Sequence, residues 1–324
     1  MTVAIRISQT GGPDVLRLEQ VDLAPPKAGE IRVRHRAVGV NFIDIYHRTG
    51  LYKLPLPTGL GLEAAGEVED VGPEVTRFKK GDRVVYASGP IGAYAEASNV
   101  PADRAVGIPD GVSFDIAAAI LLKGLTAHYL LRRTYPVKPG ETILFHAAAG
   151  GVGVIAVQWA KRLGATVIGT VGNDSKAEIA KALGCDHVIV PARENVATRV
   201  REITGGKGVP VAYDSIGRDT FLATLDSLAP LGMFVSFGNA SGPVPPFDGG
   251  LLAQKGSLFF TRPTLMHYVT TAAELDAGAG ELFELVRRGD IRIQAPRAFP
   301  LAQAAEAHRA LESRQTTGSL VLVP

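Results

Sequence analysis

The sequence predicts an α/β protein of two domains, one rich in short strands and one with a parallel sheet covered by helices. Three observations predict it. Glycines punctuate short segments in the first third, strands and helices alternate from about residue 123 onward, and a glycine-rich turn follows the first strand of that alternation. A length of 324 residues is sufficient for two ordinary domains. Hydrophobic residues make up 46% and charged residues 20%, the balance of a folded globular chain.

The first third is predicted to form a compact barrel-like β domain. Residues 31–37 alternate apolar and polar side chains with period two, as a half-buried strand does. Glycines then separate further short segments, among them residues 66–71 and 83–87. Turn-forming residues at this density favour short strands joined by tight turns.

Strands and helices alternate in the middle of the chain. Strands are predicted at 142–145, 166–171, 187–190, 209–213 and 233–237, and helices at 154–163 and 175–183. This alternation predicts a parallel sheet with right-handed crossover connections.

The last part of the chain returns to a different pattern after residue 260. Helices are predicted at 272–286 and 301–311, and an apolar strand at 319–323 ends the chain. That strand needs a sheet partner, and the N-terminal β domain is the candidate. The second domain is then inserted into the first, which gives one domain of residues 1–122 plus 260–324 and another of residues 123–259.

Composition excludes several classes of function. A net charge of +2 and the absence of like-charge blocks give no basis for a nucleic-acid-binding surface. Cys185 is the single cysteine, so neither an internal disulfide nor a cysteine-based zinc cluster can form. The longest apolar run, residues 116–122, is too short to cross a bilayer, and residues 1–6 contain no signal-peptide core. We therefore predict a cytoplasmic protein with no membrane insertion and no nucleic-acid partner.

The strongest local motif is the glycine-rich turn of residues 145–153, FHAAAGGVG. It lies between a predicted strand and a predicted helix, the context that a dinucleotide fingerprint requires. Small residues let a pyrophosphate approach the helix N-terminus, where backbone N–H groups and the helix dipole hold its charge. The turn reads Ala147-x-x-Gly150-x-x-Gly153, so it departs from the common form at its first glycine. It predicts a Rossmann doubly wound domain.

The choice of cofactor depends on the tip of the second strand, about 20 residues further on. Gly172 and Asn173 occupy that tip, and Lys176 is placed where it can meet a 2′-phosphate. Asp174 is a competing signal, because a carboxylate at this point binds the ribose hydroxyls of NAD. Its alternative role is a helix N-cap. Charge matching favours NADPH.

Several further segments carry a family resemblance along essentially the whole chain. They are Asn41-Phe42-Ile43-Asp44, residues 59–66, residues 79–84, residues 122–127, Tyr213-Asp214-Ser215-Ile216-Gly217, residues 236–239 and Thr261-Arg262-Pro263. Together with the glycine-rich turn they resemble the medium-chain dehydrogenase/reductase superfamily, in its zinc-free quinone oxidoreductase branch, that of zeta-crystallin. The resemblance implies a GroES-like β-rich catalytic domain carrying the Rossmann domain, with an active site in the cleft between them.

The resemblance also implies a set of residues that line the NADPH site. They are Asn41, Tyr46, Thr126, Ala147, Gly150, Gly151, Val152, Asn173, Lys176, Ser215, Phe237, Gly238, Arg262 and Arg314. The chain departs from the family at the end of the third Rossmann strand, where a tyrosine is common. Here Pro191 follows Val190, and Arg193 is the nearby side chain that can offer charge instead.

The zinc-dependent members of the superfamily bind catalytic zinc through a cysteine, a histidine and a cysteine. Those positions read Asn41, Leu62 and Lys123 in this chain, so we predict no metal. A quinone suits metal-free reduction, because its product is aromatic and its carbonyl needs little polarisation. Candidate donors to the developing oxyanion are Asn41, Tyr46, Tyr52 and Lys123. The alternatives are that Asn41 holds a turn or a ribose, that the tyrosines only line the site, and that Lys123 is a structural cation.

The sequence thus predicts an NADPH-dependent quinone reductase that transfers a hydride to a small quinone. Two alternatives remain: an enone or enal reductase, and a non-catalytic NADPH-binding module with an RNA-binding or structural role. We predict a homodimer through sheet edges around residues 233–237 and 258–261, where Leu258-Phe259-Phe260 would otherwise expose an apolar edge. His146 and Cys185 are interpreted as buried core residues, and His47 as a surface residue.

Overall fold

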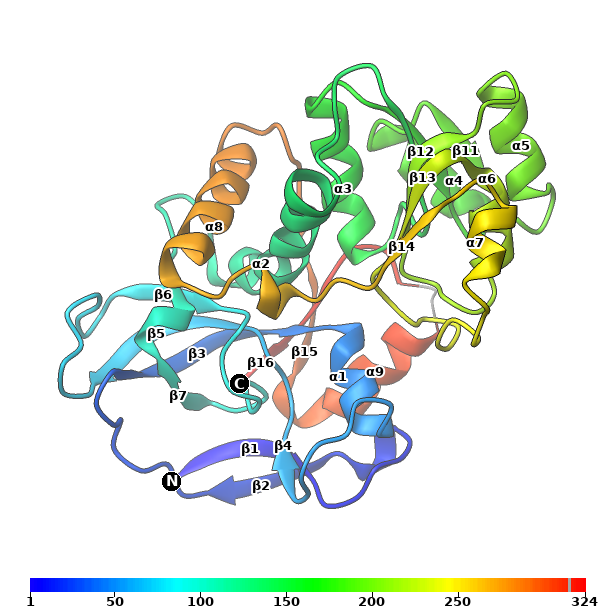
Figure 1. Cartoon of the computed structure of the whole chain (residues 1–324). Coiled ribbons are helices and arrows are strands. Elements are labelled where there is room, and N and C mark those ends of the chain that lie inside the picture. Colours follow the sequence, from blue (N-terminus) through cyan, green and yellow to red (C-terminus); the bar gives the residue numbers. More distant parts are fainter. Residues whose placement is uncertain (314–315) are drawn as a thin grey trace. The chain divides into compact units, whose positions relative to one another are not determined.

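The computed structural model describes residues 1–313 and 316–324, which divide into two compact units (Figure 1). Unit 1 comprises Met1–Leu125, Val269–Arg287 and Ile293–Pro324, and unit 2 comprises Thr126–Tyr268 and Arg288–Arg292. The chain therefore leaves unit 1, forms unit 2 and returns. The functional domain boundaries given above, 1–122 plus 260–324 and 123–259, stay a prediction.

Unit 1 is built on β3 (Glu30–Val40), whose alternating burial reflects the period-two pattern of its sequence. β3 pairs antiparallel with β5 (Ala64–Val71), β7 (Ala97–Pro101) and β16 (Leu320–Val323). The sheet runs in the order β15-β16-β3-β5-β6-β8, where the remaining strands are β6 (Arg83–Tyr86), β8 (Ala105–Gly107) and β15 (Arg297–Pro300). A second, three-stranded sheet contains β1 (Thr2–Ile7), β2 (Arg17–Val21) and β4 (Thr58–Gly59).

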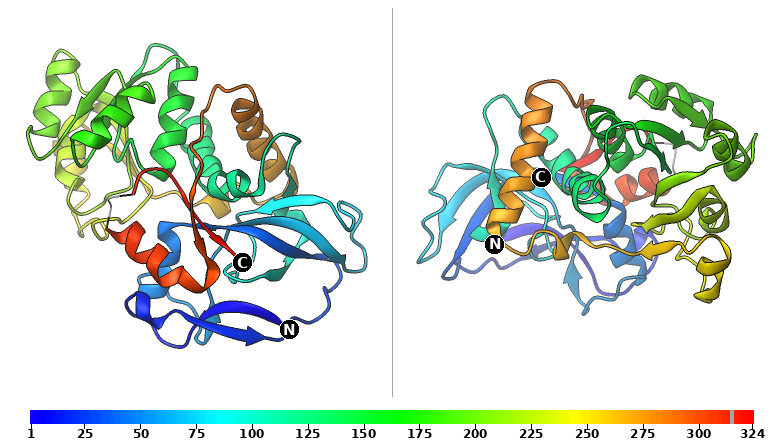
Figure 2. Two further views of the ribbon diagram at one scale, coloured as in Figure 1. Left: turned by 180° about the vertical axis from the view of Figure 1, so that it is seen from behind. Right: turned by 45° about the horizontal axis from the view of Figure 1, so that its top comes forward.

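The C-terminal strand completes this unit, as its apolar sequence predicts. β16 lies between β3 and β15, and Val321 stands opposite Gly39 in the antiparallel register. Figure 2 shows this red segment running back to the blue β3 strand. The predicted helix 301–311 consists of a 3-10 turn, Leu301–Gln303, followed by α9 (Ala304–Glu312).

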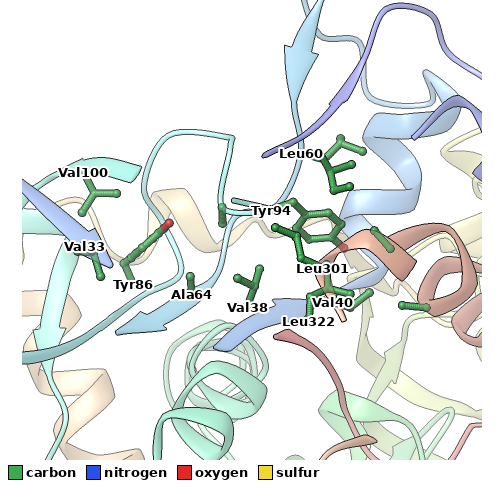
Figure 3. Packing of buried hydrophobic residues seen from close by; sticks show 14 of the residues in the cluster. Val33, Val38, Val40, Leu60, Ala64, Tyr86, Tyr94, Val100, Leu301 and Leu322 are labelled. Atoms are coloured by element: carbon green, nitrogen blue, oxygen red, sulfur yellow. The ribbon is translucent and has the colours of Figure 1, made fainter. Parts of the chain in front are cut away.

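One apolar core fills unit 1 between its sheets and helices. Tyr94 and Tyr86 are fully buried in it, and Figure 3 shows Tyr94 among Leu60, Val40 and Leu301. The α-helices of the unit are α1 (Phe42–Thr49), the larger part of α2 (Phe114–Tyr129), α8 (Ala272–Arg287) and α9. Burying a tyrosine ring leaves its hydroxyl in need of a polar partner, so each phenol must be hydrogen-bonded within this core.

Unit 2 contains one six-stranded parallel sheet in the order β11-β10-β9-β12-β13-β14. Its strands are β9 (Thr142–Phe145), β10 (Thr166–Thr170), β11 (His187–Ile189), β12 (Val209–Asp214), β13 (Leu228–Ser236) and β14 (Phe259–Thr261). Its helices are α3 (Gly151–Arg162), α4 (Asp174–Ala182), α5 (Val196–Ile203), α6 (Phe221–Ser227) and α7 (Gly250–Gln254). The predicted Rossmann architecture is confirmed.

β13 begins five residues earlier than the predicted strand 233–237 and ends before Phe237. Pro230 and the positive φ of Leu231 (61°) interrupt the regular pattern at its start. The apolar pattern that predicts a strand therefore begins only at Met233, although the strand already pairs with β12 at Leu228.

α2 (Phe114–Tyr129) contains the boundary between the two units and continues as a π-helical turn, Leu130–Thr134. By length and composition alone, this 21-residue segment is the one described helical segment that is apolar enough to cross a membrane, with a mean hydropathy of 1.4. The apolar run is thus longer than the stretch 116–122 identified in the sequence. However, 72% of the most apolar 18-residue stretch of this segment is buried within the protein, as in a core helix.

Candidate functional site

A buried polar cluster in unit 1 brings together two of the predicted catalytic residues. Lys123 Nζ donates to Asn41 Oδ1 at 2.7 Å, and the Asn41 side-chain N–H donates to Glu63 Oε2 at 2.8 Å. Glu63 also lies 3.8 Å from Lys123 Nζ as its counter-charge. Glu63 is fully buried, while Asn41 and Lys123 are 4% and 6% exposed. The cluster is therefore an ion pair bridged by an amide, held away from bulk water.

Three different elements of unit 1 bring these side chains together. Asn41 follows β3 and precedes α1, Glu63 precedes β5, and Lys123 lies within α2. The backbone N–H of Leu122 donates to Glu63 Oε1 at 2.7 Å, which ties the carboxylate to α2. Burial raises the pKa of Glu63 and lowers that of Lys123, and each opposes the other's shift by charge.

A second buried acid, Asp44, lies one helical turn from Asn41. Its Oδ2 accepts from the Asn41 backbone N–H at 2.8 Å and from the Tyr94 hydroxyl at 3.0 Å. Burial raises the pKa of Asp44 to about 7, and the charge of Glu63 adds to that rise. Asp44 is thus a carboxyl group whose protonation changes near neutral pH.

Arg48 and His308 support Tyr94 from the other side. The guanidinium of Arg48 donates to His308 Nδ1 at 3.1 Å and pairs with Glu312 at 2.5 Å. An arginine can only donate, so Nδ1 is the acceptor and the proton of His308 is on Nε2. His308 Nε2 lies 3.0 Å from the Tyr94 hydroxyl, which in turn donates to Asp44. Burial lowers the pKa of His308 to about 3, which keeps its imidazole neutral.

The two predicted catalytic tyrosines lie against each other at the C-terminal end of α1. The rings of Tyr46 and Tyr52 meet edge to face with centroids 5.2 Å apart, and Tyr46 is 9% exposed. His47 packs on the Tyr52 ring at 6.1 Å and is buried, so its assignment to the surface is wrong. It lies in a helix whose residues 44–48 are all buried, which a single histidine in the sequence does not indicate. Burial lowers the pKa of His47.

The glycine-rich turn in unit 2 has the geometry of a phosphate cradle. Gly150 is the N-cap of α3, which begins at Gly151, three residues before the predicted helix. A Cβ on Gly153 would lie 2.4 Å from the carbonyl oxygen of Ala147, so no larger residue fits there. Ala147, at the first position of the motif, has a φ of 54°, a conformation that favours glycine.

Three strand ends are tied together beneath this turn by His146. Its Nδ1 lies 3.0 Å from the Thr170 hydroxyl at the end of β10, and its Nε2 lies 2.9 Å from the Thr224 hydroxyl of α6. Thr224 also donates to Asp214 at the end of β12. His146 is fully buried and hydrogen-bonded, which confirms its interpretation as a core residue. Cys185 is likewise buried, at 7% exposure.

The tip after β10 differs from the sequence-based interpretation in one respect. Asn173, not Asp174, is the N-cap of α4, because its side-chain oxygen accepts from the Lys176 backbone N–H at 3.0 Å. The N-cap role suggested for Asp174 is therefore wrong by one residue. Asp174 instead forms an ion pair with Arg193, and both side chains are exposed. Lys176 lies in the first turn of α4, and partial burial lowers its pKa.

The remaining predicted cofactor residues of unit 2 lie at or near carboxyl ends of strands or in the glycine-rich turn. Ser215 follows β12, and a Cβ on Gly238, after β13, would lie 2.5 Å from the Ser215 carbonyl oxygen. Arg262 follows β14 and donates to the Ser236 carbonyl oxygen at 3.0 Å. The predicted cofactor residues in these two places are Gly151, Val152, Ser215, Phe237, Gly238 and Arg262. Thr126 is instead buried in α2. Arg314 lies outside the described residues.

Five side chains of the unit 1 network escaped the sequence analysis: Asp44, Arg48, Glu63, Tyr94 and His308. Glu63 carried a signal, because it is a single acid within an apolar, glycine-rich stretch. Asp44 carried one as well, because it is the third residue after Asn41 in a capping box. Arg48, Tyr94 and His308 carried none, since their contacts join distant parts of the chain. Among residues 1–313 and 316–324, no group of three or more His, Cys, Asp or Glu side chains is arranged to hold a metal ion.

Comparisons with known proteins agree with this geometry. The family model of the alcohol dehydrogenase GroES-like domain matches residues 27–110, and that of the zinc-binding dehydrogenases matches residues 151–279. Quinone oxidoreductase of Pseudomonas aeruginosa is 56% identical over 325 residues, 100% of both chains. The 2-haloacrylate reductase of a Burkholderia species is 47% identical over 100% of this chain and 99% of its own. The crystal structure of Escherichia coli quinone oxidoreductase complexed with NADPH superimposes with a TM-score of 0.98 at 51% identity, over 99% of this chain and 100% of that one.

Proposed function

The chain belongs to the quinone oxidoreductase branch of the medium-chain dehydrogenase/reductase superfamily, and from that membership we propose that it is an NADPH-dependent quinone reductase that acts without a metal ion. The observation that carries the proposal is full-length similarity, at more than half identity, to a quinone oxidoreductase. The reaction transfers a hydride to the quinone, and a proton from water completes the hydroquinone.

The residues of unit 2 fit a dinucleotide. Gly153 and Gly238 stand where a Cβ would collide with neighbouring backbone, and a Cβ on Gly172 would meet nothing within 4 Å. Gly150, Gly151 and Val152 at the start of α3 would hold the pyrophosphate through backbone N–H groups. Asn173 and Lys176 would hold the adenosine end, and Ser215, Phe237, Gly238 and Arg262 line the neighbouring strand ends. Bound there, NADPH supplies the hydride.

The buried polar cluster of unit 1 contains the candidate group that stabilises negative charge on the quinone. An ammonium has three N–H donors, and Lys123 directs one at Asn41, so further donors can serve a quinone oxygen as negative charge develops on it. Asn41 and Glu63 orient this ammonium. We therefore propose that Lys123 is the group that stabilises the oxyanion, and that Asn41 acts mainly by holding it.

Tyr46 and Tyr52 are proposed to orient the acceptor ring, and one of them to donate a hydrogen bond to its oxygen. Their edge-to-face contact fixes both rings with little rotational freedom. Replacing each tyrosine by phenylalanine separates the two roles. Phenylalanine keeps the ring and removes only the hydroxyl, so kcat should fall at the tyrosine that donates a hydrogen bond and stay unchanged at the one that only orients the acceptor ring.

The decisive experiment follows NADPH oxidation with 1,4-benzoquinone, in the presence and absence of a chelator. We expect turnover that a chelator does not change, and no stoichiometric zinc in the purified protein. Absence of NADPH binding, or activity that depends on zinc, would refute the proposal.

A second candidate function is the reduction of a conjugated carbon–carbon double bond. It is favoured by the 2-haloacrylate reductase of Burkholderia, which is 47% identical over the full chain. In that reaction the hydride goes to carbon, and a proton must be delivered to the neighbouring carbon. Comparing kcat/KM for a benzoquinone, an enone and 2-chloroacrylate under one set of conditions decides between the two.

We further propose that the protein is a cytoplasmic homodimer. β14 is the edge strand of the unit 2 sheet, and Phe259 on it is 56% exposed. An apolar sheet edge of this kind is a template for pairing with a second copy. β13, which contains Met233–Ser236 of the other predicted segment, lies one strand further in, so the pairing edge is β14. Light scattering at micromolar concentration should give twice the mass of one chain.

A further inference from the structure

Two cations and one acid surround the tip that follows β10 in unit 2. Lys176 lies in the first turn of α4, and Arg193 lies in the turn that follows β11. The third group is Asp174, the first residue of α4, which pairs with Arg193. At neutral pH the three groups carry one net positive charge.

Hydrogen bonds hold both the backbone and the guanidinium of Arg193 in this place. Its backbone N–H donates to the Val190 carbonyl oxygen at 2.9 Å, which closes a tight turn after β11. Its guanidinium donates to Asp174 Oδ2 across the ends of the neighbouring strands β10 and β11. The Arg193 side chain is nonetheless 66% exposed, and the carboxylate takes up one part of a planar group that carries five donors.

The same tip has room for a ligand. A Cβ on Gly172 would meet nothing within 4 Å, and α4 directs its N-terminal end at this region. In a dinucleotide fold the ribose of the adenosine lies about 20 residues after the glycine-rich turn, where an arginine accommodates a 2′-phosphate. Counted from Gly153, that point is Asn173, beside which Asp174 holds Arg193.

We infer that Arg193 is a second cation for the 2′-phosphate of NADPH, and that Asp174 holds it in position while weakening its effect. The inference rests on the proposed function, because it takes NADPH to be the cofactor. A 2′-phosphate carries close to two negative charges, more than Lys176 alone can balance. Asp174 places Arg193 before the cofactor arrives, but its own negative charge then lies close to the phosphate.

The two roles predict opposite effects of two substitutions. Arg193→Ala removes a charge-assisted contact and should raise the Kd of NADPH about tenfold. Asp174→Asn keeps a hydrogen-bond acceptor for Arg193 and removes the repelling charge, so the Kd of NADPH should fall about threefold. NADH has no 2′-phosphate, and its Kd should change by less than about twofold in both variants.

The matched control is Arg287→Ala. Arg287 is an exposed arginine of α8 in unit 1 that pairs with Glu284 at 2.9 Å, so its removal changes the net charge equally and leaves the tip of unit 2 unaltered. Calorimetric titration of the wild type and the three variants with NADPH and NADH measures all Kd values. Repeating the NADPH titrations at high salt should reduce the difference between wild type and Arg193→Ala.

The outcomes separate this inference from the function on which it rests. A wild type that binds neither cofactor refutes the proposed function, and the inference with it. A wild type that binds NADPH, with Arg193→Ala binding it no more weakly than Arg287→Ala does, refutes the inference alone. Equal weakening of NADPH and NADH by Arg193→Ala also refutes it, as does a weakened NADPH complex in Asp174→Asn.

Discussion

Replacing Lys123 by methionine tests the charge balance of the buried cluster in unit 1. Methionine is similar in length to lysine but uncharged, so the change removes the cation and leaves Glu63 fully buried. At 3.8 Å and an effective dielectric constant of about 20, the lost attraction amounts to about 4 kcal/mol. Breaking buried ion pairs by removing one partner costs about 3–5 kcal/mol, the same range. We expect Lys123→Met to lower the free energy of unfolding by that amount near pH 8.

The loss should depend on pH, because Glu63 can accept a proton. Burial already raises the pKa of Glu63, and Lys123 opposes that rise, so the pKa is higher still in the variant. A carboxyl group with a raised pKa binds protons more tightly in the folded state, and stability therefore falls as the pH rises from its unfolded to its folded pKa. Asp44, with a pKa near 7, likewise lowers the stability of the folded protein as the pH rises from about 4 to about 7, and it does so in the wild type as well.

Urea unfolding followed by circular dichroism, at about pH 5 and about pH 8, measures this effect. The loss at the lower pH should be less than half of that at the higher pH. Lys181→Met is the control, since Lys181 forms an exposed pair with Glu178 at 2.8 Å and should change stability by less than about 0.5 kcal/mol. Equal losses at both pH values, or a loss no larger than that of the control, would refute the electrostatic argument.

Three further predictions concern unit 2. Lys176→Ala should raise the KM for NADPH about ten- to a hundredfold. We expect kcat and the kinetics with NADH to stay unchanged, because the 2′-phosphate is remote from the nicotinamide. Steady-state kinetics with both cofactors test this, and an equal rise in the KM for NADH would contradict it. Gly153→Ala would place a Cβ 2.4 Å from the Ala147 carbonyl oxygen, so we expect loss of measurable NADPH binding by calorimetry while the circular dichroism spectrum is kept. Ala147→Gly relieves a φ of 54° and should raise the free energy of unfolding by about 1 kcal/mol; a denaturant midpoint at or below that of the wild type would argue against strain at this turn.

The sequence was sufficient for the parts of the molecule whose signals are local. The strand 142–145 is β9, residue for residue, because apolar side chains and flanking turns mark both of its ends. The glycine-rich turn was recognisable because the close approach of Gly153 to backbone permits no other residue. β16 was assigned correctly to the N-terminal sheet, since an apolar strand at the end of a chain must pair somewhere.

The buried polar network could not be derived in the same way. Arg48 and His308 are hydrogen-bonded although they are 260 residues apart, and neither belongs to a pattern that indicates a partner. The ion pair of Asp174 with Arg193 likewise depends on two strand ends being neighbours. Sequence reasoning identified Asn41 and Lys123 as chemically interesting, but it could not show that Glu63 neutralises one and binds the other. Such contacts are set by tertiary structure, so local patterns carry no trace of them.

The pairing of β3 with β16 has a consequence for how the protein is made. Val38–Val40 must wait for Leu320–Leu322, about 280 residues further along the chain, so one edge of β3 stays unpaired until those residues have been synthesised. Unit 2 is nearly contiguous in sequence and can fold as soon as it has emerged. We expect nascent chains to hold a folded nucleotide-binding unit beside an incomplete one that recruits chaperones. Deleting residues 320–324, which contain β16, should leave unit 2 intact while sending most of the product into aggregates.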